Sequence, residues 1–213
     1  MSTLLVTRPK HDSTVSYLHY WAKPILDLAL RRKIDVIDLD HSKANRKEVE
    51  GRIRKLKPEL IFLNGHGNSH EICGHDDEAI VDGGNADALS GSITYALSCS
   101  AAEKLGSQIV AGGGKAFIGY TRDFFFVRDL TKATKPTTDT VAQQFLEPAN
   151  TVVASLLKGH TVKESYEHSQ SAYRRNITNL LSSASDPEAA QYIRFLLWNM
   201  RHEQYEGDGS ATV

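Results

Sequence analysis

Two stretches decide the fold of this chain: Leu60-Ile-Phe-Leu-Asn-Gly-His-Gly67 and Ile93-Thr-Tyr-Ala-Leu-Ser-Cys-Ser100. Each is a short apolar run that ends in a reactive side chain, His66 between two glycines and Cys99 among small residues. Because the carboxyl ends of parallel strands open onto one edge of a sheet, we expect the two endings to meet in one cleft. A histidine beside a cysteine can act as the general base of a nucleophile. His66 and Cys99 are therefore the candidate catalytic residues.

The composition is that of an ordinary globular protein. The chain has 213 residues, of which 40% are hydrophobic and 24% charged, and its formal net charge is −1. This balance argues against a nucleic-acid-binding surface, and no apolar stretch is long enough to span a membrane. The first apolar residues soon meet Arg8, which is unlike a signal peptide, and two cysteines make no disulfide framework. We expect a cytoplasmic protein without nucleic-acid or membrane partners.

Apolar and amphipathic segments alternate through the first half of the chain. This order predicts a mostly parallel sheet with helices on both faces. Strands are expected at 3–6, 34–39, 60–63, 93–97 and 115–120, and helices at 13–32, 42–56 and 101–110, with a small hairpin inside 69–85. Three further helical patterns cover 140–158, 161–181 and 187–203. We expect one domain over 1–206, with an α/β core at 1–127 and a helical C-terminal layer at 137–206, followed by a disordered tail at 207–213.

The residues around the two candidates suit acyl-transfer chemistry. The backbone N–H groups of Gly67 and Cys99 are expected to form the donor pair that stabilises a tetrahedral oxyanion. A helix beginning at Ala101 would direct its positive end at Cys99 and favour the thiolate.

The order of the two residues, histidine first and cysteine at the end of the next core strand, differs from that of papain-like proteases and amidotransferases. It resembles the caspase-like peptidases of clan CD, and looks closest to CHAT domains and gingipains. The matching segments are Phe62-Leu-Asn-Gly-His-Gly67 and Tyr95-Ala-Leu-Ser-Cys-Ser-Ala101. The resemblance implies a three-layer α/β/α sandwich with additional C-terminal helices. It also implies a cysteine endopeptidase that cleaves protein or peptide substrates through a thioester, with His66 as general base and acid, Cys99 as nucleophile, and no cofactor.

The resemblance leaves substrate specificity open. In caspases, legumain and metacaspases, the residue two before the cysteine is polar or acidic, whereas here it is Leu97. Leu97 and Ser98 are expected to line the substrate pocket. Arg8 there would favour an acidic P1 residue, whereas Asp12 or Asp123 would favour a basic one. Calcium dependence and an activating partner or homodimer also stay open.

Two other functions compete with the peptidase. One is a catalytically inactive binding or assembly module with the same fold. The other is a metal-binding hydrolase that uses His66, His70, Cys73 and His75, which have metal-ligand side chains at short spacing. Zinc sites usually take a second ligand pair from a distant segment, and we find no convincing pair in this sequence. We therefore predict no metal.

Overall fold

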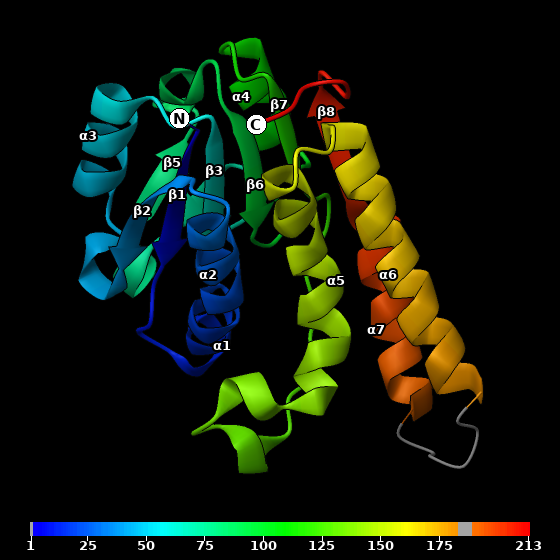
Figure 1. The fold of residues 1–213 in the computed structure, drawn as a ribbon. Coiled ribbons are helices and arrows are strands. Elements are labelled where there is room, and N and C mark those ends of the chain that lie inside the picture. The colour runs from blue at the N-terminus through cyan, green and yellow to red at the C-terminus, as the bar shows by residue number, and fades with distance from the viewer. Residues whose placement is uncertain (1, 183–188) are drawn as a thin grey trace.

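The central sheet of the computed structural model has six strands in the order β2-β1-β3-β6-β7-β8 (Figure 1). The structure describes residues 2–182 and 189–213. The strands are β1 (Thr3–Arg8), β2 (Asp35–Asp40), β3 (Leu60–Asn64), β6 (Ile93–Leu97), β7 (Ala116–Tyr120) and β8 (Glu203–Gly207). All neighbouring pairs are parallel except β7 and β8. The mostly parallel sheet expected from the sequence is confirmed.

Helices cover both faces of this sheet, because each strand sends alternate side chains to opposite sides. Leu60 and Phe62 join the core under α1 (Ser13–Trp21), α2 (Lys23–Arg31) and α5 (Thr140–Leu157). Ile61 and Leu63 join the core under α3 (Arg46–Leu56) and α4 (Leu105–Ala111). Every residue of β3 is buried, which explains its uninterrupted apolar sequence. The predicted three-layer α/β/α sandwich is confirmed.

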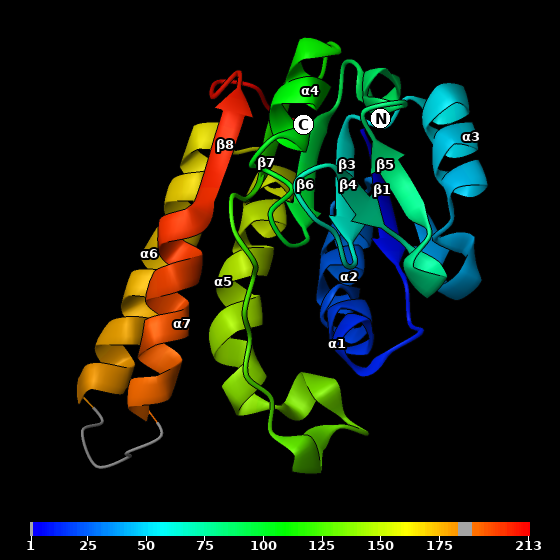
Figure 2. The same cartoon turned by 180° about the vertical axis from the view of Figure 1, so that it is seen from behind.

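Short elements connect these layers. A two-stranded antiparallel hairpin, β4 (Glu71–Cys73) and β5 (Ala79–Asp82), lies between β3 and β6 in the chain, as predicted. Its apolar side chains belong to the core on the α3 and α4 face, and Figure 2 shows the hairpin from that side. The 3₁₀ turns are η1 (His41–Lys43), η2 (His75–Asp77), η3 (Ala86–Leu89), η4 (Leu130–Lys132) and η5 (Pro136–Thr138).

The C-terminal helices form a separate hairpin beside α5. Helices α6 (Val162–Ser182) and α7 (Ala189–His202) lie side by side (Figure 2). A small core between them and α5 includes Phe145 and Tyr173. The expected start of the last helix, Pro187, lies outside the described residues. None of the helices in the described part of the chain is long and apolar enough to cross a membrane.

The chain after α7 differs from the expected helical end and disordered tail. Residues 203–207 form the edge strand β8, whose first residue, Glu203, is fully buried. Beyond it, the N–H groups of Val162 and Lys163 donate to the carbonyls of Ala211 (3.0 Å) and Gly209 (2.9 Å). Pairing with β7 and these bonds hold residues 203–211 against the rest of the protein, although the sequence there is polar.

Candidate active site

The carboxyl ends of β1 and β3 are the place where this topology favours a crevice. In the sheet β1 lies between β2 and β3, so the chain leaves β1 toward α1 on one face and leaves β3 toward the hairpin on the other. Where successive connections diverge to opposite faces, a crevice opens at the strand ends. The loop after β1 carries His11 and Asp12, and the loop after β3 carries His66.

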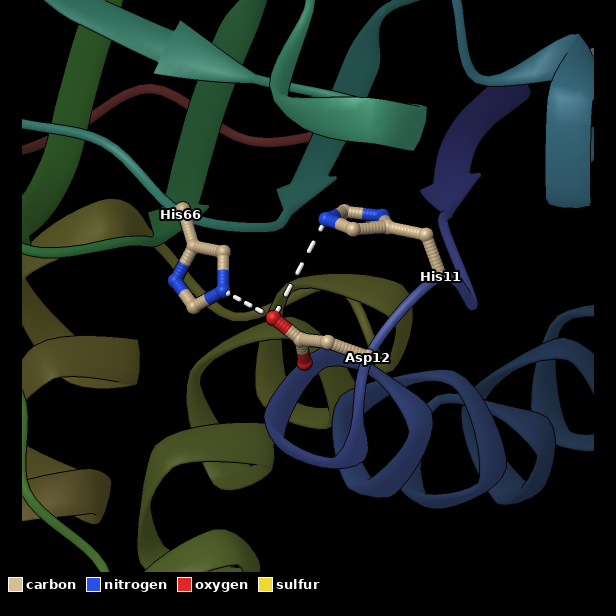
Figure 3. A group of neighbouring side chains, drawn as sticks. All are labelled: His11, Asp12 and His66. Atoms are coloured by element: carbon tan, nitrogen blue, oxygen red, sulfur yellow. Dashed lines mark hydrogen bonds and ion pairs between the residues drawn. The ribbon is translucent and has the colours of Figure 1, made fainter.

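Asp12 holds the ring of His66. Its Oδ2 lies 2.6 Å from Nε2 of His66, as Figure 3 shows, while its Oδ1 accepts the N–H groups of Thr14 (2.7 Å) and Val15 (2.9 Å) at the start of α1. Burial acts to raise the pKa of Asp12. The hydrogen bonds from His66 and the two amides outweigh it, and the pKa lies below its ordinary value. Asp12 is therefore an ionised helix cap that also accepts a hydrogen bond from His66.

The glycines on either side of His66 permit its tight turn. Gly65 has φ +154°, and a Cβ there would run into the carbonyl of Cys73. A Cβ on Gly67 would run into the hydroxyl of Ser98. Gly67 and Ile72 pair in an isolated antiparallel bridge. The hydrogen bonds of this bridge are made by the residues on either side of the pair, so the N–H of Gly67 points away from the hairpin.

His66 and Cys99 follow neighbouring strands at matching positions. The register of β3 and β6 pairs Asn64 with Leu97, and each candidate comes two residues later. Ser98 ties the two endings together, because its Oγ donates to the carbonyl of His66 (2.9 Å). Cys99 is half-buried, and this burial raises the pKa of its thiol. A backbone hydrogen bond from Phe124 acts in the opposite direction, and the negative charge of Asp123 adds a smaller increase to the pKa. The thiol thus keeps its proton at neutral pH in the resting state.

The helix expected at Ala101 begins later. Ser100 has φ +55° and is followed by turns, and α4 starts only at Leu105. The N–H of Ser100 donates to the carbonyl of Arg122 (3.1 Å), which lies just after β7. The N–H of Ala102 donates to the carbonyl of Tyr120 (3.0 Å), the last residue of β7. The prediction that a helix N-terminus favours a Cys99 thiolate is wrong, because these bonds hold the chain in a turn.

The charged candidates for substrate binding lie in different surroundings. The Arg8 guanidinium is nearly buried and pairs with Asp38 through two bonds of 2.8 and 2.6 Å, with Asp40 at 3.4 Å. Asp123 accepts a hydrogen bond from Ser100 (3.0 Å) and has no ion pair among the described residues. The positive charge of Arg8 is thus neutralised within the protein, whereas Asp123 keeps an uncompensated negative charge beside Cys99.

The two uncharged candidates are buried. Leu97 is 2% exposed and belongs to the core under α1 and α5. Ser98 is also 2% exposed, and its hydroxyl is used by the His66 carbonyl. Both side chains are therefore packed inside the protein and are not exposed at its surface.

The four proposed metal ligands do not converge. His70 bonds to the neighbouring Ser69 hydroxyl (3.0 Å), and burial, with the charges of Glu71 and Asp77, raises the pKa of Cys73 to about 11. Within residues 2–182 and 189–213, the groups of side chains that could hold a metal ion include neither His70 nor Cys73.

His11 is a neighbour of His66 that was not among the residues expected near the site. Its ring lies 6.0 Å from that of His66 between centroids, in an edge-to-face arrangement, and its Nε2 lies 3.1 Å from Oδ1 of Asp77. The feature of the sequence that could have identified His11 is the pair His11-Asp12 shortly after the first strand.

Comparisons with known proteins give a structural likeness. No protein-family model matches the chain, and no curated protein matches its sequence. The structure is similar to the Arg-specific cysteine proteinase gingipain R (RgpB), with a TM-score of 0.66 and 11% identity over 100% of this chain and 47% of that chain. In the complex of the Porphyromonas gingivalis RgpB pro- and mature domains, the TM-score is 0.64 at 12% identity, over 100% and 48%. The chain spans about half the length of these structures, and the likeness shows that it shares their fold.

Proposed function

We propose that this protein is a cysteine endopeptidase with Cys99 as nucleophile and His66 as general base. The observation that carries the proposal is the 2.6 Å bond from His66 to Asp12, on the loop beside the strand that leads to Cys99. A histidine fixed by a carboxylate, at the end of the strand next to the one that leads to a thiol, suits nucleophilic catalysis. The caspase-like fold shared with gingipain R, a cysteine proteinase, supports the same function.

Asp12 determines which nitrogen of His66 is the base. The pKa of Asp12 lies below its ordinary value, so at neutral pH its carboxylate only accepts hydrogen bonds. The proton of the neutral His66 ring must therefore be on Nε2, which leaves the lone pair on Nδ1. Nδ1 points away from Asp12 in Figure 3 and is the atom that would take the Cys99 proton. Asp12 then acts as a positioning residue that stabilises the imidazolium.

The remaining steps follow from this assignment. The raised pKa of Cys99 means that the thiolate forms only as its proton passes to His66, together with attack on the peptide carbonyl. The N–H groups of Gly67 and Cys99 would stabilise the oxyanion. His66 then gives the proton to the leaving amine, and water hydrolyses the thioester at Cys99. No step requires a metal or cofactor.

We further propose that the enzyme prefers a basic P1 residue, and that Asp123 binds it. Arg8 is neutralised by Asp38 and Asp40 and cannot attract an acidic side chain, and Asp12 is engaged by His66. Asp123 is close enough to Cys99 to affect the pKa of the thiol and carries no paired cation among the described residues. The Arg specificity stated for gingipain R is consistent with this assignment.

An activity-based probe tests the catalytic assignment. The purified protein is incubated with a peptidyl acyloxymethyl ketone that has Arg at P1, and labelling is measured for the wild type, Cys99→Ala, His66→Ala and the control Cys73→Ala. We expect labelling in the wild type and in Cys73→Ala only. If the wild type does not react, or if all four proteins react equally, the peptidase assignment fails and a binding module with this fold replaces it.

A further inference from the structure

Imidazole and carboxylate groups from three separate segments converge beside the proposed catalytic histidine. The Nε2 atoms of His11 and His66 and the Oδ2 atom of Asp12 all lie within 4.8 Å of one another (Figure 3). Asp12 Oδ2 is 2.6 Å from His66 and 3.9 Å from His11, and Asp77 Oδ1 is 3.1 Å from the same nitrogen of His11. Two nitrogen donors and one oxygen donor, from His11, His66 and Asp12, thus surround one small volume, with Asp77 beside His11.

The fold directs these donor atoms into that volume. Asp12 uses Oδ1 to cap α1, so only Oδ2 is turned toward the two rings. The side chain of His11 is 12% exposed and provides a fixed nitrogen, whereas His66, Asp12 and Asp77 are 38%, 40% and 60% exposed and can adjust. Two carboxylates without a lysine or arginine partner among the described residues also favour a cation.

The geometry fits a small divalent ion. Ligands at about 2.0 Å from a tetrahedral Zn²⁺ are separated by about 3.3 Å, and the distances of 2.6 and 3.9 Å from Asp12 Oδ2 to the nitrogens of His66 and His11 lie on either side of this value. Imidazole nitrogens select Zn²⁺ over Ca²⁺ and Mg²⁺, which prefer oxygen ligands.

We propose that His11, Asp12 and His66 form an inhibitory Zn²⁺ site. The inhibition rests on the proposed peptidase function. Nε2 of His66 must lose its proton to bind Zn²⁺, and the neutral ring then carries a proton taken up at Nδ1. That proton occupies the lone pair that accepts the proton of Cys99. Zinc therefore turns the general base into its inactive tautomer without touching the thiol.

Calorimetry on the full chain tests the site independently of activity. ZnCl₂ is titrated into Cys99→Ala, which removes the thiol as a competing ligand, and into the double variants that add His11→Ala or, as a matched control, His70→Ala. We expect one ion to bind, at least about 10-fold more weakly after His11→Ala and unchanged after His70→Ala. Absence of binding, or equal affinity with and without His11, would overturn the proposal.

Inhibition is then measured on enzyme that keeps Cys99. We expect Zn²⁺ to inhibit the wild type reversibly, with recovery in EDTA, and the half-inhibitory concentration, measured against each protein's own zinc-free rate, to rise at least about 10-fold in His11→Ala. Equal inhibition of both proteins would assign the ion to the thiol and refute this mechanism while the peptidase stands. Zinc binding that depends on His11 in a protein without peptidase activity would instead refute the proposed function and leave the site in place.

Discussion

Replacement of Asp12 separates its two structural roles, because one oxygen caps α1 and the other binds His66. Asparagine caps a helix about as well as aspartate, whereas alanine loses about 1 kcal/mol of capping energy. In a chain of 213 residues, that difference corresponds to a melting temperature about 2–4 °C lower for Asp12→Ala than for Asp12→Asn. The bond to His66 joins half-exposed groups and adds at most about 1 kcal/mol to stability.

The effect on catalysis should be large in both variants. Without the carboxylate, Nε2 of His66 is no longer fixed as the protonated nitrogen, and the imidazolium formed during attack loses its counter-charge. Supporting groups of this kind are worth about 10- to 100-fold. We therefore expect kcat to fall by about that factor in Asp12→Asn and Asp12→Ala, with little change in KM.

The assay combines steady-state cleavage of an Arg-P1 peptide with thermal unfolding of the same protein samples. If Asp12 acted only as a helix cap, Asp12→Asn would keep both full activity and the wild-type melting temperature. Full activity in a folded Asp12→Asn would therefore refute the tautomer argument. A rise in KM with unchanged kcat would instead identify Asp12 as a substrate-binding residue.

Three other perturbations test the surroundings of the site. Because burial and Asp123 raise the pKa of Cys99, alkylation of Cys73→Ala by iodoacetamide should keep accelerating above pH 8.5, the ordinary thiol value. Asp123→Asn should lower kcat/KM for an Arg-P1 substrate by about 10- to 150-fold, the effect of about 1.5–3 kcal/mol from a charged hydrogen bond, and for an Ala-P1 substrate by less than about 3-fold. Burial raises the pKa of Glu203 from 4.5 to about 7, so the folded protein holds a proton that the unfolded chain releases, and stability should fall by roughly 3 kcal/mol from pH 4.5 to 7. Glu203→Gln should remove this component of the pH dependence in thermal unfolding.

Each of these expectations has a contrary result. An alkylation rate that reaches its plateau below pH 7 would mean that Cys99 is already a thiolate. Equal losses for both substrates in Asp123→Asn would indicate a structural role for this residue. A Glu203→Gln variant that loses stability between pH 4.5 and 7 as the wild type does would show that other groups cause the loss.

The strands that carry the candidate residues could be predicted from sequence, because β3 and β6 are short apolar runs with a reactive residue just beyond each. β8 could not be predicted in the same way. Residues 203–207 are mostly polar, and Glu203 is buried only because Ser169, Gln170 and Tyr120 bind its carboxylate at 2.9–3.3 Å. Those partners come from β7 and α6, and no local pattern in the sequence connects them to Glu203. The start of α4 was missed for the same reason, because distant carbonyls bind the amides after Cys99.

The roles of the charged residues depended on the order of the strands, which the sequence does not contain. Pairing of β1 with β2 puts Arg8 opposite Asp40, so the Arg8 guanidinium is neutralised by the neighbouring strand. Pairing of β1 with β3 brings Asp12 to His66, so this acid is placed to orient the proposed base. Asp123 follows β7, on the other side of Cys99, and has no ion pair among the described residues. The same side chain therefore has different surroundings at positions 12 and 123, and the proposed preference for a basic substrate depends on the β7 side of Cys99.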